Sequence, residues 1–268
     1  MRPKPAHLRP EYGAQFQDAA VVAAYPHRPP YPEEVFTRLQ ELLVGPSIVL
    51  DIGCGTGDIA RRLAPLVERL DAVDISAPMI AAGKSLPSGD APNLHWQVGA
   101  LEDAPLDPPY GLIVAGESLH WMEWSVVMPR LRGALAPGAR LALVGRAEVP
   151  APWTEEFFAL IRRSSTNRDF QPYDLIEELT SRGLYEVEGG AQTEPVRFNQ
   201  SIDVYIESIH SRNGFSRDRM TPADVAAFDA AARALIAPHA PDGMVTLHIR
   251  AELRWGQPQH GDSSGSVG

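Results

Sequence analysis

The sequence predicts an α/β fold: a doubly wound, mostly parallel sheet with helices on both faces. Between residues 33 and 146, segments with apolar residues at helical spacing alternate with short apolar runs. These runs are apolar on both faces, as the strands of a covered parallel sheet are. A turn dense in glycine follows the first run, at the sheet edge where this fold class binds ligands.

The helices and strands are expected in a regular order. Helices are expected over residues 33–44, 59–66, 76–85 and 125–135. Strands are expected at residues 48–50, 70–75, 94–98, 111–115, 140–144 and 244–255. Pro65 should end the second helix early, because proline has no amide proton for the helix interior. Ser76 is expected to cap the third helix with its hydroxyl oxygen.

The composition is that of an ordinary globular protein and excludes several classes. Of 268 residues, 44% are hydrophobic, which excludes a wholly disordered chain. The net charge of −10 repels phosphate groups, so we expect neither nucleic acid nor an anionic membrane as a partner. The single cysteine, Cys54, excludes an internal disulfide and a cysteine-built zinc site, and no metal is expected. With no signal peptide and no apolar run of membrane-spanning length, we expect a cytoplasmic monomer or homodimer.

Gly53, Gly55 and Gly57 form the turn after the first strand. Glycine lets a ligand approach the main chain closely, although turn geometry alone can also require it. The dinucleotide fingerprint needs a third glycine at position 58, where this chain has Asp58. A carboxylate there opposes a diphosphate at the start of the helix. Asp51 would also repel a diphosphate but could accept a hydrogen bond from an ammonium group. We therefore expect a cationic nucleoside ligand that lacks a diphosphate.

Acidic residues also follow the second and third strands at the same sheet edge. Asp74 ends the second strand, where a carboxylate can accept hydrogen bonds from both hydroxyls of a ribose. Ile75 and Met79 could pack on an adenine face, although Met79 is equally suited to the core. Leu101 and Glu102 follow the third strand, and a solvated acidic loop is the alternative reading of that segment.

Three segments together resemble the class I S-adenosylmethionine (SAM)-dependent methyltransferases. They are residues 49–57 (Val-Leu-Asp-Ile-Gly-Cys-Gly-Thr-Gly), 72–76 (Ala-Val-Asp-Ile-Ser) and 101–105 (Leu-Glu-Asp-Ala-Pro). The resemblance implies SAM as cofactor and a seven-stranded sheet whose last strand runs antiparallel. The implied cofactor-binding residues are Asp51, Gly53, Cys54, Gly55, Gly57, Asp74, Ile75, Met79, Ala100, Leu101, Glu102 and Glu117. The family often has Asp where this chain has Ala100, so main-chain amides and Glu102 would contact the adenine amino group.

The flanking segments 25–32 (Tyr-Pro-His-Arg-Pro-Pro-Tyr-Pro) and 117–121 (Glu-Ser-Leu-His-Trp) resemble the trans-aconitate methyltransferase-like (methyltransferase type 11) subgroup. Members of that subgroup act on small molecules, often carboxylates. The resemblance implies a helical insertion that covers the substrate. The expected parts are an N-terminal arm or lid (1–32), the SAM-binding core (33–146), a helical cap with one added strand (147–240), the final strand (241–256) and a disordered tail (257–268).

His120 is the candidate catalytic residue, because it follows the fourth strand and faces the expected reaction centre. It could act as a base or orient the acceptor, and a packing role is the alternative. Arg28 could pair with the carboxylate of SAM or of an anionic substrate, and Tyr25 would accompany it in the arm. Trp121 is expected to wall the substrate pocket, and Arg212 is the candidate selector of a carboxylate. The aromatic residues expected either in an apolar pocket or in the core are Trp153, Phe157, Phe158, Phe170 and Tyr173.

The sequence therefore favours a methyltransferase that acts on a small molecule, by O-methylation of a carboxylate or a hydroxyl, with nitrogen and carbon acceptors still open. Two alternatives stay open: a nicotinamide-dependent oxidoreductase and a SAM-binding protein without catalysis. A nucleic-acid methyltransferase is disfavoured by the negative charge and by the lack of an Asn-Pro-Pro-Tyr type motif at residues 117–121.

Overall fold

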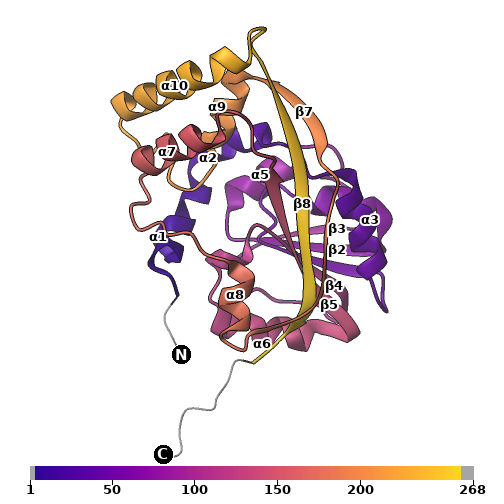
Figure 1. Cartoon of the computed structure of the whole chain (residues 1–268). Coiled ribbons are helices and arrows are strands. Elements are labelled where there is room, and N and C mark those ends of the chain that lie inside the picture. The colour runs from indigo at the N-terminus through magenta and orange to yellow at the C-terminus, as the bar shows by residue number, and fades with distance from the viewer. Residues whose placement is uncertain (1–3, 261–268) are drawn as a thin grey trace, which may run out of the picture.

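The computed structural model describes residues 4–260 and has one mixed sheet at its centre (Figure 1). The strands are β1 (Ile48–Ile52), β2 (Arg69–Asp74), β3 (Leu94–Val98), β4 (Tyr110–Gly116), β5 (Leu135–Glu148), β6 (Tyr185–Gln192), β7 (Val196–Ser201) and β8 (Met244–Pro258). Their order is β3-β2-β1-β4-β5-β8-β6, and β7 also pairs with β8. The neighbouring pairs from β3 to β5 are parallel, whereas β8 is antiparallel to β5, β6 and β7. The predicted doubly wound α/β class is confirmed.

The sheet has eight strands, whereas seven were predicted, and the segment 147–240 contributes two strands, whereas one was predicted. The reason is the length of β8. Its C-terminal half pairs with β6 through residues 252–258, and its N-terminal half pairs with β7 through residues 244–249. The two strands therefore lie one after the other along the same edge of β8. The lateral order of the sheet still has seven places.

The helices of four or more residues are α1 (Pro10–Gly13), α2 (Ala19–Ala24), α3 (Glu33–Leu42), α4 (Ala60–Leu63), α5 (Ala77–Lys84), α6 (Trp124–Ala134), α7 (Thr154–Ser164), α8 (Leu175–Thr180), α9 (Ile202–His210) and α10 (Pro222–Ile236). As predicted, α4 ends before Pro65, and the chain continues as a 3₁₀ turn. Ser76 caps α5, because its Oγ accepts a hydrogen bond from the Met79 amide at 3.3 Å.

Apolar side chains cover both faces of the sheet. Neighbouring residues of β1 face opposite sides: Leu50 belongs to one buried cluster and Val49 to the other. A third cluster lies between α7, α9, α10 and the first half of β8, at one end of the molecule (Figure 1). The protein thus has a covered sheet and a separate helical cap, joined by the long strand β8.

The N-terminal arm, residues 4–32, contacts both the sheet region and the cap. Its Phe16 carbonyl accepts a hydrogen bond from Ser76 Oγ at 2.9 Å, and Lys4 Nζ donates to the His120 carbonyl at 3.0 Å. Asp18 forms an ion pair with Arg219 of the cap at 2.6 Å. The predicted tail begins late, since β8 continues to Pro258; residues 261–268 lie outside the described part of the chain. Over residues 4–260, no helix is long and apolar enough to cross a membrane.

Candidate functional site

The glycine turn connects β1 with α4 and depends on glycine at each of its three positions. Gly53, Gly55 and Gly57 have φ values of 63°, 56° and 78°, in the left-handed region that other residues rarely adopt. Packing adds to this requirement, because a Cβ atom on Gly53 would lie 2.5 Å from the Cβ of Ser118. Tyr25 of the arm covers the turn, with its hydroxyl 3.3 Å from where a Cβ of Gly55 would be. The turn is therefore a fixed main-chain surface under the arm.

Asp74 lies at the end of β2, beside this turn, with its carboxylate held by the main chain. Its Oδ2 accepts a hydrogen bond from the Gly55 amide at 2.8 Å, and its Oδ1 accepts one from the Ser76 amide at 2.7 Å. Burial raises the pKa of Asp74, while the two amide donors lower it. Each oxygen keeps a second acceptor position for a ligand. Ile75 is 54% exposed next to it, but Met79 is 1% exposed and packs in the interior.

Asp51, at the end of β1, is 2% exposed and accepts a hydrogen bond from the Ala60 amide at 3.1 Å through Oδ2. Burial raises its pKa to about 7; the Ala60 hydrogen bond opposes this, and the charges of Asp74 and Asp58 add to it. A cation bound beside Asp51 would lower this pKa and stabilise the charged form. The carboxylate therefore fits an ammonium group.

The predicted residues after β3 are less accessible than expected. Leu101 is buried in the core, and Glu102 Oε1 accepts a hydrogen bond from the Glu123 amide at 2.7 Å. Ala100, before them, is half-buried. Cys54 is buried, and burial raises the pKa of its thiol well above the usual value. In this loop, Ala100 and Glu102 keep part of their surface free for a ligand.

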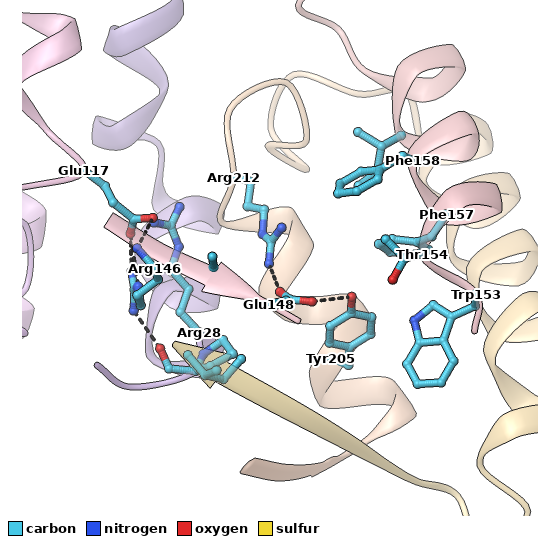
Figure 2. A pocket seen from close by; sticks show the side chains of 14 residues that line it. Arg28, Glu117, Arg146, Glu148, Trp153, Thr154, Phe157, Phe158, Tyr205 and Arg212 are labelled. Carbon is cyan, nitrogen blue, oxygen red and sulfur yellow. Dashed lines mark hydrogen bonds and ion pairs between the residues drawn. The ribbon is translucent and has the colours of Figure 1, made fainter. Parts of the chain in front are cut away.

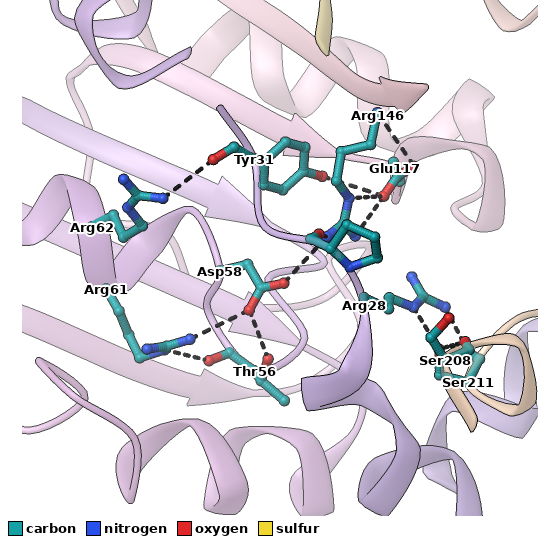
Figure 3. A network of polar contacts seen from close by, with 11 residues as sticks. Arg28, Tyr31, Thr56, Asp58, Arg61, Arg62, Glu117, Arg146, Ser208 and Ser211 are labelled. Carbon is teal, nitrogen blue, oxygen red and sulfur yellow. Dashed lines mark hydrogen bonds and ion pairs between the residues drawn. The ribbon is translucent and has the colours of Figure 1, made fainter. Parts of the chain in front are cut away.

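Glu117 follows β4 and forms a tight pair with Arg146 of β5 (Figure 3). Its Oε2 accepts hydrogen bonds from Arg146 Nε at 3.0 Å and Nη2 at 2.8 Å. Glu117 has a φ of 53°, unusual for a residue with a side chain. Desolvation raises its pKa, but Arg146 and Arg28 outweigh this and lower it to about 2. Glu117 is therefore ionised at neutral pH.

Arg146 is a residue that sequence reasoning missed. Its Nη1 donates to the Pro29 carbonyl at 2.7 Å and lies 3.6 Å from Asp58 Oδ2. Its guanidinium also stacks on the Tyr31 ring, 4.3 Å from the centroid. Arg146 thus joins β5 to the glycine-turn segment and to the arm (Figure 3). The available signal was a cation two residues after the predicted strand at residues 140–144, at the edge where the ligand was expected.

A cavity of about 370 Å³ opens from this pair toward the cap (Figure 2). Its charged lining residues are Arg28, Glu117, Arg146, Glu148 and Arg212. Its aromatic lining residues are Trp153, Phe157, Phe158 and Tyr205. A cavity of this size, apolar with a few charged groups, is typical of small-molecule sites.

Glu148, also missed by the sequence reasoning, joins the two kinds of lining residue. It accepts a hydrogen bond from Arg212 Nη2 at 2.6 Å and one from the Tyr205 hydroxyl at 3.0 Å. Its signal was weak, because its partners come from α9 and the segment after it, far along the chain. Of the predicted substrate residues, Arg28 and Arg212 line the cavity.

Tyr25, His120 and Trp121 are not among the residues that line this cavity. The Arg28 guanidinium carbon lies over the Tyr25 ring, 4.2 Å from the ring centroid. His120 is half-buried against Trp121, with ring centroids 4.7 Å apart, and Trp121 also contacts the Phe16 ring of the arm. Burial lowers the pKa of His120 to about 4, partly opposed by Glu117. The ring is therefore uncharged at neutral pH.

Comparison with known proteins bears on the same region. Residues 49–138, from β1 into the first part of β5, match the family described as "Methyltransferase domain". The similarity to a methyltransferase domain therefore extends over about a third of the chain. The match includes the glycine turn, Asp74 and Glu117, which are among the residues on which the prediction of a SAM-dependent methyltransferase rests.

Curated relatives match only part of the chain. An uncharacterised methyltransferase of Mycobacterium bovis is 34% identical over 103 residues, or 38% of this chain and 51% of the relative. The trans-aconitate 2-methyltransferase of Pseudomonas paraeruginosa is 36% identical over 104 residues, which is 37% of this chain and 36% of that enzyme. This chain therefore spans about half the length of the first relative and about a third of the second.

Solved structures share the fold of most of the chain. A structure described as a type II methyltransferase, from Anaeromyxobacter dehalogenans, has a TM-score of 0.62 at 23% identity and covers 86% of this chain and 97% of its own. A SAM-dependent methyltransferase from Geobacter sulfurreducens, solved with S-adenosylhomocysteine (SAH), has a TM-score of 0.52 at 17% identity and covers 93% and 98%. The fold is that of the class I methyltransferases.

The residues of the methyltransferase domain fit SAM in their chemistry. Asp51 offers a buried carboxylate for an ammonium group, and Asp74 offers an oriented carboxylate for ribose hydroxyls. Ile75 offers an exposed apolar surface for a base. None of these residues requires a diphosphate or a metal. Among residues 4–260, no group of three or more His, Cys, Asp or Glu side chains is arranged so that it could hold a metal ion.

Proposed function

We propose that the protein is a SAM-dependent methyltransferase that methylates a carboxylate or hydroxyl oxygen of a small molecule. The observation that carries the proposal is the position of the cavity. Glu117 and Arg146 line it, and Arg146 also reaches Asp58 of the glycine-turn segment. Because β1 and β4 are neighbours in the sheet, their carboxyl ends place the cofactor turn and the cavity side by side.

Each cofactor residue has a proposed role. Asp51 would bind the ammonium group of SAM, Asp74 the ribose hydroxyls, and Ile75 the adenine face. The main chain of Gly53, Cys54, Gly55 and Gly57 would approach the amino-acid portion, and the loop at residues 100–102 would approach the base. We assign no cofactor contact to Met79, because its side chain is buried in the interior. SAM supplies a methyl group activated by a positively charged sulfur.

The protein's task is then to align the acceptor. The acceptor oxygen attacks the methyl carbon as the carbon–sulfur bond breaks, and the bonding electron pair returns to sulfur. Alignment of this kind is worth about 7–11 kcal/mol, so no covalent intermediate is needed. A carboxylate acceptor is already a nucleophile and transfers no proton. A hydroxyl acceptor must lose one, and His120, uncharged at pH 7, could accept it only if the acceptor extends beyond the cavity lining.

Methyl transfer from isotope-labelled SAM tests this proposal. The acceptor panel is trans-aconitate, cinnamate and p-cresol, which offer carboxylates or a phenol. We expect labelled product and an equal amount of SAH with at least one carboxylate. Binding of SAM without transfer to any oxygen acceptor would favour the non-catalytic alternative, and binding of NADH in place of SAM would favour the oxidoreductase.

A further inference from the structure

The cavity has two unlike ends. Arg28, Glu117 and Arg146 lie together at one end (Figure 2), where Arg146 also lies 3.6 Å from Asp58 of the glycine-turn segment. Trp153, Phe157 and Phe158, from α7 and the residue before it, lie at the opposite end. An acceptor that fills the cavity therefore has its polar group near the cofactor turn and its apolar part under α7.

The charges at the polar end do not cancel. Arg146 is paired with Glu117 at 2.8 Å, and Arg212 is paired with Glu148 at 2.6 Å. Three arginines and two glutamates line the cavity, so one cation is left over. That cation is Arg28: within residues 4–260, no carboxylate oxygen lies within 4.0 Å of its guanidinium nitrogens.

Arg28 is held in place by neutral groups. Its Nε donates to Ser211 Oγ at 2.7 Å and its Nη2 donates to the Ser211 carbonyl at 2.6 Å, while its guanidinium lies over the Tyr25 ring. Burial lowers its pKa, and the Glu117 charge compensates for this only in part. A single negative charge on the acceptor would supply that compensation.

The aromatic end is shaped for a flat ring. Trp153 and Phe157 are buried in the cap cluster and form a rigid wall. Phe158 is 51% exposed at the mouth of the cavity, although a large apolar side chain gains free energy from being covered. Aromatic rings pack against one another in offset or edge-to-face arrangements with more stabilisation than their contact area alone provides.

We infer that the acceptor is an aromatic monoanion, with its carboxylate at Arg28 and its ring against Phe157 and Phe158. The inference rests on the proposed function and narrows its substrate class. The Pseudomonas relative is named after trans-aconitate, a tricarboxylate. Such an acceptor would bring two further negative charges to a cavity whose other arginines are already paired. It would also leave the aromatic wall uncovered.

Four probes separate charge from ring, with calorimetry on the SAH-loaded protein as readout. Cinnamate has both a ring and one carboxylate, cinnamamide has the ring without charge, crotonate has the charge without a ring, and trans-aconitate has three carboxylates and no ring. We expect cinnamate to bind at least tenfold more tightly than each of the other three, since only cinnamate combines one charge-assisted hydrogen bond to Arg28 with a ring against the aromatic end.

Matched variants assign the two ends. Phe158→Ala should weaken cinnamate and cinnamamide by the same factor, whereas Phe170→Ala should change neither; Phe170 is also 51% exposed but packs on His7, outside the cavity. Arg28→Gln should remove the preference for cinnamate over cinnamamide, and Arg9→Gln, at an exposed arm residue, should keep it. The ratio of the two affinities reports charge recognition even if Arg28→Gln loosens the arm.

The outcomes separate the inference from the function on which it rests. Equal or tighter binding of trans-aconitate, or equal binding of cinnamate and cinnamamide, would overturn the inference. SAH binding with no cinnamate binding would also overturn it while leaving the methyltransferase function intact. Failure of SAH itself to bind would overturn the proposed function.

Discussion

Arg146 holds Glu117 through two hydrogen bonds to the same carboxylate oxygen, at 2.8 and 3.0 Å, and so ties the end of β5 to the end of β4. The same guanidinium donates to the Pro29 carbonyl of the arm. The pair therefore sets the geometry of the polar end of the cavity and fastens the arm above it.

Arg146→Gln should lower the free energy of unfolding by about 1–3 kcal/mol, because it leaves the Glu117 charge and the Pro29 carbonyl without their donor. Glu117 is partly exposed, which keeps the cost in the lower half of this range. Urea unfolding measures it. Arg140→Gln is the control, since Arg140 lies on β5 like Arg146 but is more exposed, and it pairs with Glu188 of β6. Equal losses in the two variants would show that the Arg146 contacts add nothing to stability.

Gly53→Ala should lower the free energy of unfolding by about 2 kcal/mol or more. Its backbone is left-handed, and the new Cβ would lie 2.5 Å from Ser118 Cβ. Gly133→Ala, in α6 with nothing within 4 Å of the new Cβ, should instead leave stability unchanged or raise it by about 0.5–1 kcal/mol. Thermal unfolding of both variants checks the contrast; a neutral Gly53→Ala would contradict it.

Asp74→Asn should weaken SAH binding about tenfold or more, with no loss of secondary structure. The amide nitrogen that replaces one oxygen is a donor, so it cannot accept from the Gly55 or Ser76 amide or from a ribose hydroxyl. The oxygen that remains is uncharged and a weaker acceptor than a carboxylate oxygen. Calorimetry measures the loss. Asp103→Asn, at an exposed residue of the next loop, is the control. Unchanged affinity in Asp74→Asn would remove Asp74 from the cofactor site.

The affinity for SAH should rise with pH between about 6 and 8. Burial raises the folded-state pKa of Asp51 to about 7, and a bound ammonium group would lower it again. Binding should therefore release a proton below pH 7, and the affinity gain should level off once Asp51 is ionised in the free protein.

Titrations in buffers of different ionisation enthalpy measure this proton release. 5′-Methylthioadenosine, which lacks the amino-acid portion, should show no such pH dependence, and Asp51→Asn should remove it for SAH. A pH-independent SAH affinity in the wild-type protein would mean that Asp51 does not face the ammonium group.

The local elements could be predicted because their signals are local. The strand at 94–98 and the cap at Ser76 depend on residues next to one another, and both are confirmed. The apolar β1 leading into three glycines likewise predicted the turn between β1 and α4. The roles that we propose for Asp51 and Asp74 follow from their place at strand ends, which the sequence pattern sets.

The cavity could be predicted only in part. Arg146 pairs with Glu117, and Glu148 pairs with Arg212. The fold brings these partners together from distant parts of the chain, so no local sequence pattern predicts the pairs. Phe157 and Phe158 were expected either in a pocket or in the core; Phe157 is buried in the cap and also lines the cavity. Trp121 was expected to wall the pocket, but the arm covers it through Phe16, a contact that depends on how the N-terminal segment docks.

The central claim is that the turn after β1 and the carboxylate of Asp74 bind a sulfur nucleoside without a diphosphate. The most direct test is a calorimetric titration of the wild-type protein with SAH and, separately, with NADH. We predict saturable binding of one SAH per chain and no measurable heat with NADH. Saturable binding of NADH with no response to SAH would contradict the claim.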